Sequence, residues 1–304
     1  MYFATYLENG SEKIGVLNSS RTKIMDMEKL YVSFGLAEGL KSCPKTMLEF
    51  VEFCHDGVLK QLQQLTDQDF NNNGVEIEKV KLCAPIPYPK RNIFCLGKNY
   101  LDHAKEVGVV LGDQDEVPQY PIYFSKVASP ATGHGDVIEY MPGVVTRLDY
   151  EVELAIVIGK EGKNIPKEKA EEYIFGYTIL NDVSERGLQK RHGQWHKGKS
   201  LDTFSPMGPY LVHKSMIPFP VELEISCSVN GEVRQQSNTN NLIFDIPTIL
   251  SDLSKGMTLK SGDIIATGTP AGVGMGFSPF KFLNSGDIVS CSIEKIGTLT
   301  NPVK

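Results

Sequence analysis

Glu151 and Glu153 are the first residues whose type and spacing indicate chemistry. They lie in Leu148–Ile158, where apolar and other residues alternate. In a β-strand the two carboxylates would share one face, roughly 6–7 Å apart. A solvated strand face gives the same pattern, but Ala155 and Val157 continue that face as apolar residues. A face that is polar at one end and apolar at the other points into a pocket, where buried carboxylates need a cation or protons.

A third carboxylate, Asp182, ends the strand-like run 175–182. It either joins the acidic pair or caps a helix expected from Val183 onward. Three carboxylates without a nearby Cys or His would select a hard divalent cation, Mg²⁺ or Mn²⁺, one per site. His192 and His196 have the spacing of one helix face, but the glutamate of a zinc-protease motif is absent, so they suit surface or lid positions.

A histidine and a glutamate form the second group. If a helix starts at Asn99 or Asp102, His103 and Glu106 lie one turn apart on one face and can hydrogen-bond. A carboxylate beside an imidazole fixes its tautomer and raises its basicity, as a general base requires. The alternative is an exposed ion pair of little energetic value. The polar stretch Gly108–Gln119 is expected to be a mobile loop that can order over a substrate.

A glycine-rich turn, Thr267–Gly276, follows an expected strand at 263–266. Such a turn can present backbone N–H groups to an anion, or serve only as a tight turn. It matches neither the P-loop pattern nor the GxGxxG spacing, which disfavours nucleotides and favours a small carboxylate. No Gly-x-Ser-x-Gly motif supports serine-hydrolase chemistry.

Length and composition limit the elements that can position these residues. The chain has 304 residues, 41% hydrophobic and 22% charged residues, and a net charge of −6. These values predict a globular protein of two domains and disfavour nucleic acid as a partner. The apolar runs are too short for a membrane span, and the N-terminus lacks a signal peptide. Six cysteines without a CxxC pair indicate reduced thiols and a cytoplasmic protein.

The first part of the chain is predicted to be a small α+β domain, residues 1–84. Strands at Tyr2–Leu7 and Lys13–Leu17 flank an Asn-Gly turn, which favours a hairpin. One helix after Pro44 is expected, with apolar positions from Met47 to Leu65. The polar run Asp67–Gly74 is expected to be a loop.

Three prolines make residues 85–90 a stiff connector, which we take as the domain boundary. Residues 91–304 are predicted to be mostly β. Gly-Asp followed by two β-branched residues occurs three times, and each occurrence predicts a turn that begins a buried strand. These turns are Gly135–Ile138, Gly262–Ile265 and Gly286–Val289.

Five motifs along Arg91–Val303 together resemble the fumarylacetoacetate hydrolase (FAH) superfamily. In chain order they are Gly-Lys-Asn-Tyr-x-x-His-x-x-Glu, Asp-Tyr-Glu-x-Glu-Leu, Gly-Tyr-x-x-x-Asn-Asp, Lys-Ser-x-Asp-Thr-Phe-x-Pro-x-Gly-Pro and Thr-Gly-Thr-Pro-x-Gly-Val-Gly. The chain is most similar to the shorter bacterial members. The resemblance implies an α+β, predominantly β protein, with a mixed β-roll catalytic domain and a small α/β N-terminal domain. It also implies a homodimer.

The resemblance further implies roles for individual residues. Mg²⁺ or Mn²⁺ would be held by Glu151, Glu153 and Asp182. His103 and Glu106 match the family's catalytic dyad. The remaining matches are Lys199 beside the metal and the substrate contacts Lys126, Arg186, Gln189 and Thr269. Fumarylacetoacetase proper has a fourth, upstream metal carboxylate, and this chain has no match for it.

The expected activity is metal-dependent cleavage of a C–C bond in a small 2-oxo acid or diacid through a stabilised enolate. Oxaloacetate decarboxylation is the first expectation, and acylpyruvate hydrolysis, which also needs an activated water, is the second. An alternative is an isomerase or decarboxylase of 2-hydroxy-dienoic diacids from aromatic catabolism. A non-catalytic binding protein would be expected to have lost the acidic trio, the dyad or the lysine, and all are present.

Overall fold

The computed structural model describes residues 1–36, 40–111 and 117–304. The first part contains β1 (Tyr2–Glu8), β2 (Ser11–Leu17), β3 (Lys23–Asp26), α1 (Met27–Ser33), α2 (Met47–Phe53), α3 (Asp56–Leu62), α4 (Asp67–Asn73), β4 (Val75–Glu76) and β5 (Lys81–Leu82). The rest contains β6 (Ile93–Gly97), α5 (Leu101–Leu111), β7 (Ile122–Lys126), β8 (Leu148–Asp149), β9 (Val152–Ile158), α6 (Ala170–Tyr173), β10 (Ile174–Asn181), β11 (Ser184–Glu185), α7 (Arg186–Arg191), α8 (His196–Lys199), β12 (Met207–His213), β13 (Glu224–Val229), β14 (Glu232–Asn238), α9 (Ile246–Leu253), β15 (Ile264–Ala266), β16 (Ile288–Ile293) and β17 (Gly297–Pro302). The protein contains both helices and strands, and strands predominate, as predicted.

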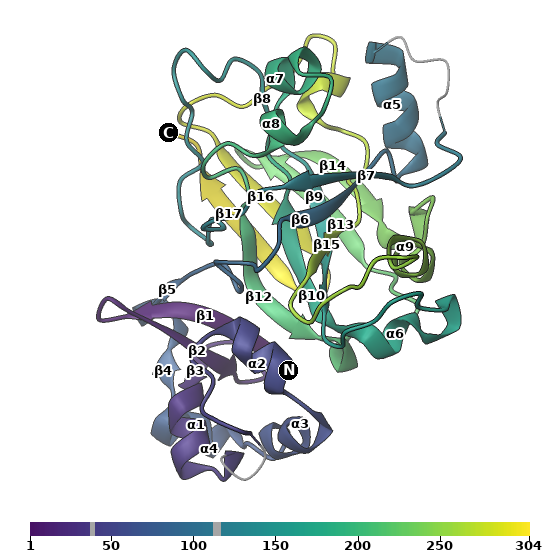
Figure 1. Ribbon diagram of the computed structural model, residues 1–304. Helices are drawn as coiled ribbons and strands as arrows, with labels where there is room; N and C mark the ends of the chain where they lie inside the picture. Colours follow the sequence, from purple (N-terminus) through teal and green to yellow (C-terminus); the bar gives the residue numbers. More distant parts are fainter. Residues whose placement is uncertain (37–39, 112–116) are drawn as a thin grey trace.

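One large mixed sheet runs through both parts of the molecule (Figure 1). Its order is β4-β3-β2-β1-β12-β10-β9-β15-β6-β7, with β5 also paired to β1. A second sheet, β14-β13-β16-β17, lies against it, since β13 and β16 contact β9 and β10. Every residue of β9 and of β10 is therefore buried. The two strands that lead to the acidic residues form the centre of the core.

The N-terminal segment joins this sheet through the pairing of β1 with β12, in which Tyr2 lies opposite Val212. The predicted hairpin is confirmed: β1 and β2 flank Asn9 and Gly10, which have φ of 52° and 80°. Because the two parts share a sheet, the division into domains at residues 85–90 stays a prediction.

The helices of this segment differ from the prediction. The single helix expected after Pro44 is two helices, because Cys54 is extended and the His55 side chain accepts from the Gly57 N–H to start α3. The prediction of a loop at Asp67–Gly74 was also wrong. The Thr66 side chain accepts from the Asp69 N–H, and the Asp69 carboxylate accepts from the Thr66 N–H, a capping box that starts α4.

Near the acidic residues, two boundaries differ from the prediction. The strand expected over 148–158 is interrupted between β8 and β9, and β8 pairs with β11 outside the large sheet. The helix expected from Val183 starts only at Arg186, because Ser184 and Glu185 form β11 and the Glu185 side chain caps α7. Asp182 is therefore not a helix cap.

Other predictions fall partly outside the described residues or are partly confirmed. The expected loop at Gly108–Gln119 begins later, since α5 continues to Leu111, and residues 112–116 lie outside the described ranges. Two of the three Gly-Asp turns begin strands, β15 and β16, whereas Ile138 forms only an isolated bridge with Val303. All six cysteines are free thiols. Within the described ranges, no helix is long and apolar enough to cross a membrane.

Candidate active site and metal centre

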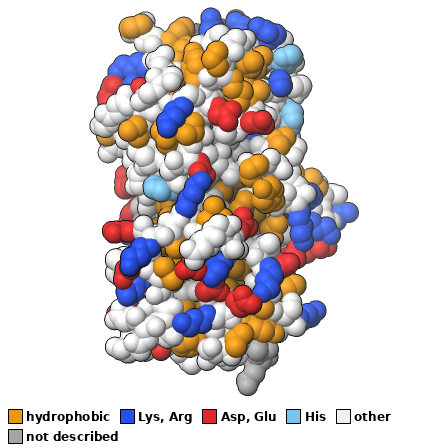
Figure 2. Space-filling model, turned by 90° about the vertical axis from the view of Figure 1, so that its left-hand side faces the viewer, with side chains coloured by type: hydrophobic (Ala, Val, Ile, Leu, Met, Phe, Trp, Pro, Cys, Tyr) orange, Lys and Arg blue, Asp and Glu red, His pale blue; other side chains and the backbone are white. Residues whose placement is uncertain are grey.

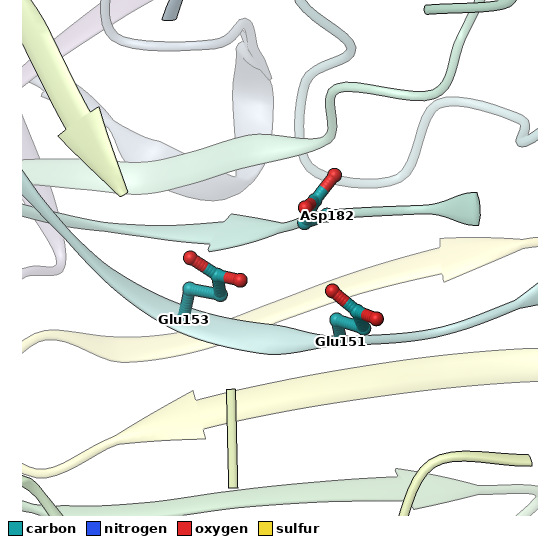
Figure 3. Close-up of side chains that lie close together, drawn as sticks. All are labelled: Glu151, Glu153 and Asp182. Carbon is teal, nitrogen blue, oxygen red and sulfur yellow. The ribbon is translucent and has the colours of Figure 1, made fainter. Parts of the chain in front are cut away.

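The three predicted carboxylates lie together in the core. β9 and β10 are antiparallel, with Glu153 opposite Leu180, and the Asp182 N–H donates to the Glu151 backbone oxygen at 2.8 Å. This pairing places Glu151, Glu153 and Asp182 close together, and Glu151 and Glu153 project from the same side of their strand toward the strand that carries Asp182 (Figure 3). One oxygen from each lies within 4.8 Å of the others, and all three residues are buried.

Two lysines and an arginine partly neutralise this cluster. Lys199 Nζ lies 2.6 Å from Glu151 Oε2 and 2.7 Å from Asp182 Oδ2. Lys126 Nζ lies 2.7 Å from Asp182 Oδ1. Arg186 Nη2 lies 2.7 Å from Glu151 Oε1. Glu151 and Asp182 are thus each held by two cations.

Glu153 differs from both. Its Oε2 accepts the Gly268 N–H at 2.8 Å, and no Lys, Arg or His among the described residues forms an ion pair with it. Burial, followed by the charges of Asp182 and Glu151, raises the pKa of Glu153 well above its usual value. Burial also acts to raise the pKa of Glu151, but Lys199 and Arg186 outweigh it and hold that pKa below its usual range.

The charge of this cluster is incompletely balanced. The buried carboxylates Asp149, Glu151, Glu153 and Asp182 lie among the buried cations Lys126, Arg186 and Lys199. When all four carboxylates are ionised, they exceed these three cations by one charge, and Glu153, which has no ion pair among the described residues, lies within reach of the other two predicted ligands. Three hard oxygen donors with this imbalance fit a divalent cation.

The predicted dyad forms on α5. His103 Nδ1 lies 3.3 Å from Glu106 Oε2, which leaves Nε2 as the ring nitrogen available to a substrate. The Gly272 N–H donates to the Glu106 carboxylate at 3.0 and 3.2 Å, so the glycine-rich turn also holds Glu106. A Cβ at Gly276 would lie 2.0 Å from Glu106 Oε1, so a larger residue there would displace this carboxylate.

The glycine-rich turn binds the protein's own carboxylates. We expected its N–H groups to bind a small external carboxylate. Instead, Gly268 donates to Glu153, Gly272 to Glu106, and Gly274 to Asp149 Oδ1 at 2.6 Å. The turn therefore positions acidic side chains of the site. The N–H groups that donate to these three carboxylates are not free to bind a substrate.

A cavity of about 390 Å³ opens above the acidic residues. Its buried wall includes His103, Glu151, Glu153 and Lys199. Trp195 and Phe124 form another wall, with their rings 5.2 Å apart. Gly97 allows this packing, since a Cβ there would lie 2.2 Å from the Trp195 ring. The cavity joins Glu151 and Glu153 to His103, so one small molecule can contact all three.

The predicted substrate contacts separate into two groups. Arg186, Gln189 and Thr269 line the cavity. Lys126 does not: it is fully buried behind Asp182, and its ammonium also donates to the backbone oxygens of Val183 and Lys199 at 2.8 and 2.6 Å. These contacts occupy its donors and place the ammonium against Asp182, so its role as a substrate contact stays a prediction. Arg186 keeps its place on the wall, but its guanidinium is bound to protein side chains.

Two buried residues that hold the site together, Asp149 and Asn99, were not among the residues predicted from the sequence. Asp149 accepts from Arg186 Nε at 2.8 Å and from two N–H groups of the glycine-rich turn, so it fixes the arginine that holds Glu151. Asn99 donates to the backbone oxygen of Thr267 at 2.8 Å and ties the start of α5 to the same turn. Both residues lie inside the family-like motifs, and this was the only signal in the sequence.

Comparison with known proteins identifies the family. The model of the fumarylacetoacetate (FAA) hydrolase C-terminal family matches residues 92–304. The chain belongs to the fumarylacetoacetate hydrolase family. A relative named oxaloacetate tautomerase YisK, from Bacillus subtilis, is 47% identical over 286 residues, which cover 92% of this chain and 93% of the relative.

Solved structures of the family share the fold. A fumarylacetoacetate hydrolase from Exiguobacterium antarcticum is 37% identical, with a TM-score of 0.80, and the match covers 100% of this chain and 99% of that one. A maleylpyruvate hydrolase from Sphingobium, solved with manganese(II) and pyruvate, is 28% identical, with a TM-score of 0.74 over 100% and 98% of the chains. Together with the buried trio, this manganese-bound structure suggests a divalent cation, without deciding between Mg²⁺ and Mn²⁺.

Proposed function

We propose that this enzyme forms the enolate of a small 2-oxo acid with the help of a divalent cation, and that oxaloacetate is its substrate. The observation that carries the proposal is one cavity lined by two of the three acidic residues, Glu151 and Glu153, together with Lys199 and His103. The sequence alone favoured decarboxylation. The close relative named an oxaloacetate tautomerase now makes keto–enol tautomerisation the first reaction to test, with decarboxylation second.

A divalent cation held by Glu151, Glu153 and Asp182 would polarise the 2-oxo group of the substrate. The Lys199 ammonium lies 2.6 Å from Glu151 and is placed to stabilise negative charge on the same substrate oxygen. Burial acts to lower the pKa of Lys199, but Asp182 and Glu151 outweigh it and raise that pKa, so the amine stays protonated.

The dyad would move the proton. His103 Nε2 removes a proton from C3 of the keto acid, and the electrons pass into the C2–C3 bond and onto the 2-oxo oxygen. Return of that proton from the protonated His103 to the 2-oxo oxygen gives the enol and restores the neutral imidazole, and the reverse sequence gives the keto form. Glu106 keeps the imidazole in one tautomer and orientation through its contact with Nδ1.

The alternatives share this enolate. In decarboxylation, the C3–C4 bond of oxaloacetate breaks instead of a C3–H bond, and CO₂ leaves. In acylpyruvate hydrolysis, the dyad must first activate a water, a reaction in line with the neighbour named maleylpyruvate hydrolase. The apolar rings of Phe124 and Trp195 on the cavity wall restrict water there and favour the reactions that need none.

A substrate panel with defined metals tests the proposal. The metal-stripped protein is supplied with Mg²⁺, Mn²⁺ or no metal and assayed with oxaloacetate, acetylpyruvate and a 2-hydroxy-dienoic diacid. Keto–enol exchange is followed by enol absorbance, and decarboxylation by CO₂ release. We expect metal-dependent exchange of oxaloacetate that is faster than CO₂ release. Turnover of the dienoic diacid alone, or equal rates without metal, would overturn the proposal.

We also propose a homodimer, which the family resemblance implies. Sedimentation equilibrium of the full chain tests it directly, and a single species of 33.7 kDa would contradict it.

A further inference from the structure

The wall of the cavity changes character from its floor to its rim. At the floor, Glu151, Glu153 and Lys199 are buried. At the rim, Arg147 and Lys190 are exposed. Among the described lining residues, the only carboxylates are the two glutamates of the floor. The rim is therefore cationic, whereas the floor carries the enolate chemistry.

The two rim cations keep their charge available. Neither Arg147 nor Lys190 forms an ion pair with any residue in the described part of the chain. Their backbones are nevertheless fixed. The Arg147 N–H donates to Glu185 Oε1 at 3.0 Å, and the Arg147 carbonyl accepts the Arg186 N–H at 3.1 Å. Lys190 lies in α7, directly after the cavity residue Gln189.

Apolar side chains complete the cavity. Val107, Met275, Phe280 and Phe282 line it beside the charged residues. Phe280 and Phe282 pack with their rings 5.3 Å apart. A ligand that suits this lining has one end that can bind the proposed cation at the floor, a short carbon chain, and an anionic end for the rim.

We propose that Arg147 and Lys190 bind the distal carboxylate of the substrate, so that the site selects 2-oxo diacids over 2-oxo monoacids. This inference rests on the proposed function, because the floor must hold the 2-oxo acid end. Guanidinium and ammonium groups are suited to carboxylates, and a cationic rim also attracts a dianion toward the cavity. The two residues thereby determine specificity and take no part in proton transfer.

The matched substrates are oxaloacetate and its 4-methyl ester, which keeps the carbon skeleton and removes the distal charge. The variants are Lys190→Gln and Arg147→Gln. Arg191→Gln is the control, because Arg191 is the next exposed cation of α7 and is not among the residues that line the cavity. Keto–enol exchange of both substrates is measured with each protein, and kcat and KM are determined separately.

We expect each rim variant to lower kcat/KM for oxaloacetate roughly tenfold, mainly through KM, and to leave the ester within about twofold. Arg191→Gln should behave as the unmodified protein does. Equal losses on both substrates, or unchanged kcat/KM for oxaloacetate, would overturn the role of the rim. A protein that is active on both substrates with equal kcat/KM contradicts this inference alone, whereas inactivity of the unmodified protein on both contradicts the proposed function.

Discussion

Two hollows among the described residues are lined by charged side chains, and they differ in how their charges are held. The first is the cavity above the acidic trio. The second, of about 530 Å³, lies where α2 and α3 meet the ends of β9, β10 and β12. Its charged residues Lys160 and Glu172 are exposed, whereas the carboxylates of the first cavity are buried and bound at 2.6–2.8 Å.

This difference indicates which of the two hollows is suited to catalysis. A charge held in a buried network acts through a low effective dielectric and is already oriented, whereas an exposed charge is screened by water. On the face that Figure 2 shows, basic and acidic side chains are interspersed, as in the second hollow. Volume and charge count therefore do not distinguish a reactive site from a surface groove, and burial with fixed partners does.

The largest expected effect comes from the carboxylate without a cation. Glu153→Gln should lower kcat/KM at least roughly 10³-fold, because a ligand of the proposed cation is lost. It should also abolish tight Mn²⁺ binding in calorimetry. Thermal stability should be unchanged or higher, since a neutral amide replaces a buried charge. Glu172→Gln, in the second hollow, is the matched control and should leave activity and Mn²⁺ binding unchanged. A Glu153→Gln protein that binds Mn²⁺ normally would remove this residue from the metal site.

The dyad should give the next largest effect. His103→Gln removes the proposed base and should lower kcat by roughly 10²–10³-fold. Mn²⁺ affinity should stay within about threefold, because His103 is not among the predicted ligands. His213→Gln, which changes the buried histidine of the second hollow, should keep full activity. If the two histidine variants lose activity equally, the assignment of His103 as base is wrong.

The residues of the reactive cavity were more predictable from sequence than the elements around them. The acidic trio was found from its alternation and from its place at a strand end, features that depend on local backbone geometry. The dyad was found from its helical spacing. The position of Lys126 could not be found in this way, because whether a lysine contacts substrate or a neighbouring carboxylate depends on which side of Asp182 the fold places it.

The predicted boundaries of helices and strands were wrong where a local hydrogen bond or a distant strand partner overrides the pattern of apolar residues. The spacing from Met47 to Leu65 is helical throughout, yet the His55 side chain starts a second helix within it. The Thr66–Asp69 capping box turned an expected loop into a helix. The strand expected at 148–158 breaks because β8 pairs with β11, a partner distant in sequence. Apolar periodicity predicts the buried face but not these local hydrogen bonds.

A smaller effect is expected at the contact between the glycine-rich turn and the dyad. Gly276→Ala places a Cβ against the Glu106 carboxylate and should displace it from the Gly272 N–H. We expect a loss in kcat of roughly tenfold, because the base is reoriented and not removed. The test is a double-mutant cycle with Glu106→Ala. In that background the extra methyl group has no carboxylate to displace, so its effect on kcat should vanish. Additive losses would show that Gly276 acts elsewhere.

The smallest expected change concerns the second hollow and affects stability, not turnover. Burial, together with the charges of the N-terminal ammonium and Lys214 and against that of Asp56, lowers the pKa of His213 to about 4. An unfolded histidine titrates near 6.5, so between pH 6.5 and pH 4 the unfolded chain binds a proton that the folded chain excludes. The stability due to neutral His213 is thus fully present above pH 6.5 and is lost as the pH falls toward 4, by up to about 3 kcal/mol. Urea unfolding at pH 7.5 and pH 5 checks this: the unmodified protein should lose more stability than His213→Gln. Equal losses would contradict a neutral, buried His213.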